Sequence, residues 1–331
     1  MAAEQVDQND GRSTAGAKTH QRTHRAMGTG FTLYVDCTDE AQAQSCFQTV
    51  FEEIDRVEAT FSRFRPASEI SRINREAADG PMVTDPEVFR LLATAMEISR
   101  KTCGVFDITV GRLTQAWGFQ AGQPAIPDTA TLAEAEAAVG WELVALDPAW
   151  RTVEFLRPGV ELDAGGIAKG YAVDCALEAL RAAGVHGLLD AGSSSIAASD
   201  ELFGNQWTVG IANPEDSTKE LCRVRIGRRA LSTSGIREQS FSHEGRVYSH
   251  LIDPTARGHE KRKSELEVLQ ATVLAPSSML ADALSTAMFL LGPERGRIAL
   301  RDFPECAVLW VCRGSEGVIW LAEQWPKDGM A

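Results

Sequence analysis

Apolar residues recur at strand spacing and then at helix spacing in the first part of the chain. In residues 27–35 the alternating apolar positions Phe31, Leu33 and Val35 predict a strand with one buried face. Thr38 can cap a helix that follows. The apolar positions of that helix lie three or four residues apart: Phe47, Val50, Phe51, Ile54, Val57 and Phe61.

A second helix is predicted from Asp85-Pro86, because proline is favoured in the first turn of a helix. Its apolar stripe comprises Val88, Leu91, Leu92, Ala95 and Ile98. Residues 120–129 contain glycine and proline and predict a loop. A short helix rich in alanine and glutamate follows and ends at Gly140.

The middle of the chain changes to short strands. Strands predicted at 152–155 and 160–162 lead to Gly165-Gly166, and a helix runs from about Ile167 to Ala183 before Gly184. Further strands are predicted at 187–191, 207–211, 223–226, 230–233 and 268–275, and a hairpin of 239–243 and 246–252 is predicted around Glu244-Gly245.

The last part of the chain returns to helix and then to strand. Pro276-Ser277 opens a helix through Leu291 that ends at Gly292. A helix near 294–301 and strands at 307–311 and 317–321 complete the pattern. Because strands and helices are mixed without strict alternation, the predicted fold class is α+β.

Length and charge narrow the classes of function. The 331 residues suffice for one large domain or two small ones, and we expect a disordered tail over residues 1–24 and a folded domain over 25–331. A formal net charge of −13 argues against a nucleic-acid partner, because phosphate contacts need clustered Lys and Arg. No stretch approaches 18 apolar residues, so no membrane span is expected.

The cysteines indicate a reducing compartment. There are seven, an odd number, scattered and without a C-x-x-C pair. This usage argues against a disulfide framework and a zinc site and favours free thiols. The first residues contain no apolar run typical of a secretory signal, and we expect a cytoplasmic protein.

Gly165-Gly166 and Lys169 form the first segment that could carry chemistry. Two glycines at the start of a helix let the backbone approach a phosphate closely, and the free N–H groups and the helix dipole favour an anion. Lys169 lies in the first turn, within reach of the same anion. The alternative is a plain strand-to-helix turn with a solvated lysine.

Asp282 and Thr286 form the second segment. Their four-residue spacing puts a carboxylate and a hydroxyl on one face of an apolar helix. Both are hard oxygen ligands suited to Mg²⁺, and a buried Asp without a partner would be costly. The alternative is an Asp in a hydrogen-bond network at a helix end.

Three further side chains are candidates for binding or catalysis. His250 follows a predicted strand and could act as a base or hydrogen-bond donor, although a lone His is more often structural. Asp107 lies in an apolar run bounded by glycines and needs a buried partner, such as an adenine amino group or backbone N–H groups. Phe64 could stack on a flat ring or pack against the domain.

The ordered set of these segments resembles the ApbE family of flavin transferases, also called FAD:protein FMN transferases. The resemblance spans about residues 25–292. The matching segments, in chain order, are Met27-Gly28-Thr29, 61–74, 104–113, 163–174, 192–195, Ser234-Gly235, 250–254 and 281–286.

This resemblance implies an α+β fold with two subdomains of mixed or antiparallel sheet, flanking helices, and FAD in the cleft between them. Mg²⁺ would be held by Asp282, Thr286 and the backbone carbonyl of Gly166. The implied FAD contacts are Met27, Phe64, Val105, Phe106, Asp107, Lys169, His250 and Ile252. Family members transfer FMN from FAD to a Thr or Ser of an acceptor protein and release AMP, and some relatives hydrolyse FAD to FMN and AMP.

We expect catalytic roles for His250, Lys169 and Asp282: His250 as a base near the acceptor hydroxyl, Lys169 as a positive charge beside the phosphate, and Asp282 as a ligand of Mg²⁺. No convincing acceptor segment occurs in this chain, so the acceptor is expected in another protein. Two alternatives stay open: an Mg²⁺-dependent FAD pyrophosphatase and a flavin-binding protein without catalysis. Three features depart from the family pattern. Phe64 stands where many members have Tyr, Gly192-Ser193-Ser194-Ser195 stands where many have Gly-Gly-Asp, and the usual export signal or lipid anchor is missing.

Overall fold

The computed structural model describes residues 18–119, 122–199, 207–216, 218–236, 240–244, 246–256, 266–315 and 317–326. Its largest element is an eight-stranded sheet in the order β1-β2-β6-β7-β10-β13-β14-β15. The strands are β1 (Lys18–Ala26), β2 (Thr29–Cys37), β6 (His186–Ala191), β7 (Ser195–Ala198), β10 (Ala230–Gly235), β13 (Glu267–Ala275), β14 (Ala307–Gly314) and β15 (Gly317–Glu323). Every neighbouring pair is antiparallel.

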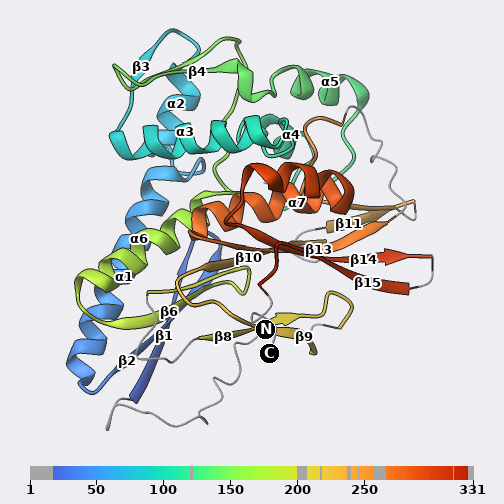
Figure 1. The fold of residues 1–331 in the computed structure, drawn as a ribbon. Coiled ribbons are helices and arrows are strands. Elements are labelled where there is room, and N and C mark those ends of the chain that lie inside the picture. The colour runs from blue at the N-terminus through green and yellow to red at the C-terminus, as the bar shows by residue number, and fades with distance from the viewer. Residues whose placement is uncertain are drawn as a thin grey trace.

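Both faces of this sheet are covered, as Figure 1 shows. Three helices contact one face: α1 (Glu40–Phe61), α6 (Ala168–Ala182) and α7 (Ser278–Ala299). A hairpin of β8 (Thr208–Ala212) and β9 (Glu220–Arg225) contributes to a separate apolar cluster on the other face. Neighbouring residues therefore point to opposite cores, with Leu189 on the helix side and Leu188 on the hairpin side.

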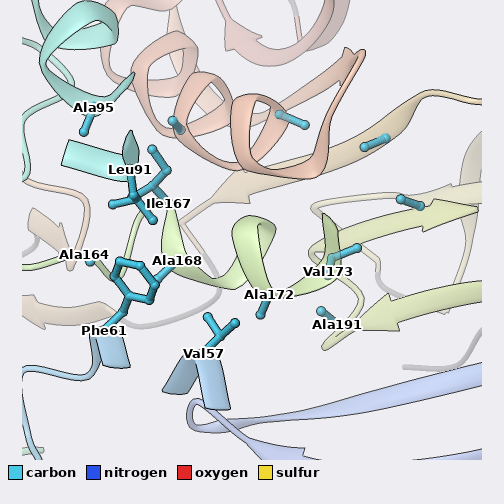
Figure 2. Close-up of a cluster of buried hydrophobic side chains, with 14 of the residues drawn as sticks. Val57, Phe61, Leu91, Ala95, Ala164, Ile167, Ala168, Ala172, Val173 and Ala191 are labelled. Carbon is cyan, nitrogen blue, oxygen red and sulfur yellow. The ribbon is translucent and has the colours of Figure 1, made fainter. Parts of the chain in front are cut away.

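The main core lies where the helices meet. Val57 and Phe61 of α1 pack beside Ala168 and Ala172 of α6 (Figure 2). Leu91 of α3 (Pro86–Lys101) reaches the same cluster. Small residues on α6 allow α1 and α7 to approach it closely, and this close approach fixes the position of the first turn of α6.

A second group of elements lies beyond α7 at the top of Figure 1. It contains a three-stranded antiparallel sheet in the order β3-β5-β4. The elements are β3 (Met82–Val83), β4 (Val144–Asp147), β5 (Thr152–Phe155), α2 (Glu69–Glu76), α3, α4 (Gly111–Ala116), α5 (Thr129–Ala137) and a 3₁₀ turn at Trp141–Leu143. A small hairpin of β11 (Ser240–His243) and β12 (Arg246–Ser249) packs through its aromatic side chains against α4 and α5.

The α+β class and the antiparallel sheet are confirmed. At the N-terminus the structure differs from the prediction. The disordered tail expected over 1–24 does not extend over residues 18–24, which belong to β1. As an edge strand β1 is mostly exposed, so it lacks the alternation that identifies a half-buried strand. Residues 1–17 lie outside the described part of the chain.

Several other boundaries differ. Asp39, not Thr38, caps α1 by accepting from the backbone N–H of Ala41. Residues 160–162 form no strand beyond one parallel bridge at Glu161. The helix predicted to end at Gly292 bends there and resumes at Pro293 as part of α7. The elements β4, β7 and α2 were not predicted, because each is only four to eight residues long and offers few positions at which a pattern can repeat.

The predicted hairpin is shorter than expected, with strands over 240–243 and 246–249. Residues 120 and 121 of the predicted loop and residues 239 and 245 of the predicted hairpin lie outside the described residues. The described helices include none that is long and apolar enough to cross a lipid bilayer.

Candidate functional site

A cavity of about 500 Å³ lies between the two groups of elements. This volume falls within the usual range of small-molecule sites. Its walls come from the β1–β2 turn, the segment after α3, the turn before α6, β10, the residues after β12, and α7. The lining residues include Met27, Val105, Phe106, Asp107, Gly166, Lys169, His250, Ile252, Asp282 and Thr286.

The cavity thus brings together every predicted site residue except Phe64. The Phe64 side chain is 69% exposed and does not line the cavity. Its ring centroid lies 5.5 Å from the guanidinium carbon of Arg63. The contact between Phe64 and FAD stays a prediction.

An ion pair between Lys169 and Asp282 forms part of the cavity wall. Lys169 Nζ lies 2.7 Å from Asp282 Oδ1, and the two side chains are 20% and 6% exposed. The backbone N–H of Gly170 donates to Asp282 Oδ2 over 3.0 Å, and Ser195 Oγ lies 3.2 Å from Oδ1. The buried carboxylate therefore has the partners that burial of a charge requires.

Contact between α6 and α7 places this pair. A β-carbon on Gly170 would collide with the carbonyl oxygen of Ser278 and lie 2.8 Å from the β-carbon of Asp282, so only glycine allows this approach. Asp174, one turn further along α6, accepts from the backbone N–H groups of Ser278 and Met279 and caps α7. Burial raises the pKa of Asp174 to about 6.

A chain of hydroxyl groups connects Asp282 to Thr286. Ser232 Oγ lies 3.4 Å from Asp282 Oδ1 and 3.4 Å from Ser285 Oγ. Ser285 Oγ lies 2.8 Å from Ser234 Oγ, which lies 3.4 Å from Thr286 Oγ1. The carboxylate and the hydroxyl predicted as metal ligands thus belong to one buried polar network.

Ser195, Ser232, Ser285 and Gly170 were missed by sequence reasoning. The serines lie on buried positions of β7, β10 and α7 with no exposed area. The available signal was the family resemblance, because its matching segments 163–174, 192–195 and 281–286 contain Gly170, Ser195 and Ser285, while Ser232 lies two residues before Ser234-Gly235. Buried hydroxyl side chains need partners, but the sequence does not reveal which ones.

The glycine turn before α6 is held by a buried arginine. Arg63, with a side chain 6% exposed, contacts Asp163 over 3.0 Å and Glu161 over 2.8 Å. Asp163 also accepts from the backbone N–H of Gly165. A β-carbon on Gly166 would lie 4.0 Å from Thr286 Oγ1, so the glycine backbone and the Thr286 hydroxyl are neighbours.

Asp107 is the acid that lines the cavity from the second group of elements, in the segment between α3 and α4. It is 6% exposed, and burial raises its pKa from 3.8 to about 6. Thr109 donates to one carboxylate oxygen from both its backbone N–H and its hydroxyl. The expectation of a buried backbone partner for Asp107 is therefore confirmed.

His250 follows β12 and lines the cavity beside Leu251 and Ile252. Its ring meets that of Phe119 edge to face at a centroid distance of 6.5 Å. Phe119 belongs with Trp117, Phe241 and Tyr248 to an aromatic cluster under the β11–β12 hairpin. This cluster fixes the segment that presents the imidazole.

The Gly192–Ser195 segment forms a tight turn in place of a carboxylate. Gly192 and Ser193 both have positive φ, 67° and 59°, and the backbone N–H of Ser193 donates to Asp190. Gly192 and Ser194 line the cavity. At this wall Gly192 and Ser194 therefore present a small backbone residue and a hydroxyl group to the cavity, where many family members have a carboxylate.

Together these features define an α+β protein whose cavity can hold an anion beside a cation-binding carboxylate. Within the described residues there is no cluster of three or more His, Cys, Asp and Glu that could hold a metal ion. A metal at this wall would therefore also use hydroxyl or carbonyl oxygens, the donors that Mg²⁺ accepts.

Comparison with known proteins identifies the family. The model of the ApbE family matches residues 27–310, and the chain belongs to this family. A curated FAD:protein FMN transferase of Treponema pallidum is 29% identical, over 84% of this chain and 82% of that protein. One of Chlamydia trachomatis is 30% identical, over 75% of this chain and 78% of that protein.

Solved structures agree with this assignment. The crystal structure of the ApbE protein from Thermotoga maritima is similar with a TM-score of 0.81 and 28% identity, covering 92% of this chain and 96% of that chain. The flavin transferase ApbE from Vibrio cholerae is similar with a TM-score of 0.80 and 26% identity, covering 93% and 97%.

Proposed function

We propose that this chain is an FAD:protein FMN transferase, which uses Mg²⁺ to move FMN from FAD to a Thr or Ser hydroxyl of an acceptor protein and releases AMP. The observation that carries the proposal is the convergence of Lys169, Asp282 and the Gly165-Gly166 turn on one wall of a 500 Å³ cavity. The names of the relatives support the same activity.

The donor set at this wall suits Mg²⁺. Asp282 offers a buried carboxylate and Thr286 a hydroxyl one helical turn away. Gly166, a neighbour of Thr286, offers its backbone carbonyl. These three residues would hold the ion. When bound there, Mg²⁺ would supply positive charge to neutralise the pyrophosphate of FAD.

The side chains of the chain itself provide positioning and charge. Phosphoryl transfer depends mainly on alignment and electrostatic stabilisation. Lys169 can bind a phosphate oxygen, because its positively charged side chain lines the cavity and is 20% exposed. Met27, Val105, Phe106 and Ile252 line the cavity and would enclose FAD.

In the proposed reaction the acceptor oxygen forms a bond to the phosphorus of the FMN half. The bond from that phosphorus to the bridging oxygen breaks, and AMP leaves with the electron pair. The hydroxyl proton passes to His250, which lines the cavity and serves as the general base. Asp107 can accept a hydrogen bond from an amino group such as that of adenine when its carboxyl group is ionised.

The location of the protein is a further part of the proposal. All seven cysteines are unpaired, which supports a reducing compartment, and we propose that the protein acts in the cytoplasm.

One incubation tests the transfer. The purified protein is mixed with FAD, Mg²⁺ and a candidate acceptor protein, and in-gel fluorescence and chromatography follow the flavin. Fluorescence on the acceptor together with AMP release is the expected result. FMN and AMP without a labelled acceptor would indicate hydrolysis, and FAD binding without Mg²⁺ dependence or turnover would indicate a flavin carrier. Either result would overturn the proposal.

A further inference from the structure

We propose that the Lys169 ammonium group and a divalent cation compete for Asp282, so that Lys169 is an exchangeable counter-ion that couples metal binding to pyrophosphate binding. This inference rests on the proposed function, because it concerns the same site. It assigns Lys169 two alternative anionic partners, the Asp282 carboxylate and a phosphate oxygen of the substrate.

The geometry at Asp282 separates fixed partners from a movable one. Oδ2 accepts from the backbone N–H of Gly170, which the helix holds in place. Oδ1 is shared by Lys169 Nζ at 2.7 Å, Ser195 Oγ at 3.2 Å and Ser232 Oγ at 3.4 Å. Lys169 is the closest of these partners and the only one on a long, flexible side chain.

Charge makes Lys169 the competitor of a metal ion. A cation that binds Oδ1 would meet the ammonium group at the same oxygen, and two positive charges at this distance repel each other. Lys169 would then have to leave Oδ1. Asp282 would keep its position, because Gly170, Ser195 and Ser232 would still hold it.

The Lys169 ammonium group can move from Asp282 to a second position in the cavity. The Lys169 side chain is 20% exposed and lines the cavity. Its flexible four-carbon chain lets the ammonium group move without a change in the helix. A phosphate bound near Gly165-Gly166 would lie on the same wall, because both glycines and Lys169 line the cavity. Binding of the metal would therefore release a cation for the phosphate, and binding of the phosphate would release Asp282 for the metal. Such coupling must be reciprocal.

A purely structural role for Lys169 and a competing role predict different changes in metal affinity when Lys169 is replaced. If Lys169 only supports Asp282, its removal should weaken or leave unchanged the binding of a metal ion. If Lys169 competes for Asp282, its removal should strengthen metal binding and weaken the binding of a diphosphate. The two affinities then move in opposite directions.

The test measures both affinities by calorimetry on the full chain. Mg²⁺ is titrated without nucleotide, and ADP is titrated without metal as a diphosphate that carries no FMN to transfer. For Lys169→Met and Lys169→Gln we expect Mg²⁺ to bind about tenfold more tightly than to the wild type and ADP about tenfold more weakly, within the usual range of coupling between sites. Lys169→Arg, which keeps the charge, should show no gain in Mg²⁺ affinity.

Lys219→Met is the matched control. Lys219 pairs with Asp216 on an exposed loop, so its replacement makes the same change in net charge and should alter neither affinity. Equal or weaker Mg²⁺ binding in folded Lys169→Met and Lys169→Gln overturns the inference and leaves the proposed transferase intact. If neither the wild type nor these variants bind Mg²⁺, the metal site of the proposed function is refuted as well.

Discussion

Replacing Asp107 by asparagine should change how the free energy of unfolding depends on pH. Burial raises the pKa of Asp107 from 3.8 to about 6 in the folded protein. Between these two values the folded protein keeps a proton that the unfolded chain has lost. The protonated group therefore contributes stability that is fully present below about pH 4 and is lost as the pH rises through about 6.

The magnitude follows from the size of the shift. A shift of about two pKa units at about 1.36 kcal/mol per unit corresponds to about 3 kcal/mol. Asparagine resembles the neutral acid in shape and can accept the two hydrogen bonds from Thr109 through its carbonyl oxygen. Relative to the wild type, the Asp107→Asn variant should gain about 3 kcal/mol of stability between pH 4 and pH 8.

Urea unfolding followed by circular dichroism at a series of pH values measures this difference. Asp174→Asn serves as a comparison, because burial also raises the pKa of Asp174 to about 6, while Asp174 caps α7 and does not line the cavity. Only Asp107→Asn should also alter ADP binding. Stability curves that stay parallel for the wild type and Asp107→Asn from pH 4 to pH 8 would refute the reasoning.

Three further variants test the site. Asp282→Asn should lower Mg²⁺-dependent turnover at least about 100-fold with an unchanged circular dichroism spectrum; near-normal turnover would remove Asp282 from the metal site. His250→Ala should slow transfer about 100-fold or more with ADP affinity retained, and a full transfer rate would exclude it as the base. Gly170→Ala should cost about 1–3 kcal/mol of stability, because its β-carbon collides with Ser278; an unchanged urea midpoint would show that α7 shifts freely.

Sequence patterns predicted the elements in which apolar residues recur over several helical turns or several strand residues. The stripes on α1, α3 and α7 were long enough to identify these helices. The strand β7 is short and wholly buried, so it has no alternation to detect. The edge strand β1 is exposed and polar for the opposite reason. Strand order could not be predicted, because it depends on contacts between distant segments.

The site was predictable at the level of segments and not at the level of contacts. Phosphate and metal chemistry pointed to Lys169 and Asp282 from their local settings, and the family resemblance joined them. Their ion pair depends on the fit of Gly170 against α7, a packing contact between residues more than a hundred positions apart. Ser195 and Ser232 contact the same carboxylate only because β7 and β10 are neighbours in the sheet.

The distance between Lys169 and Asp282 along the chain has a consequence for synthesis. The two residues are 113 positions apart, and α7 comes after most of the sheet has been made. A growing chain can therefore carry the glycine turn and Lys169 long before it carries the carboxylate. Because the site needs both Lys169 and Asp282, nucleotide and metal should protect the nascent protein from proteolysis only once α7 has left the ribosome.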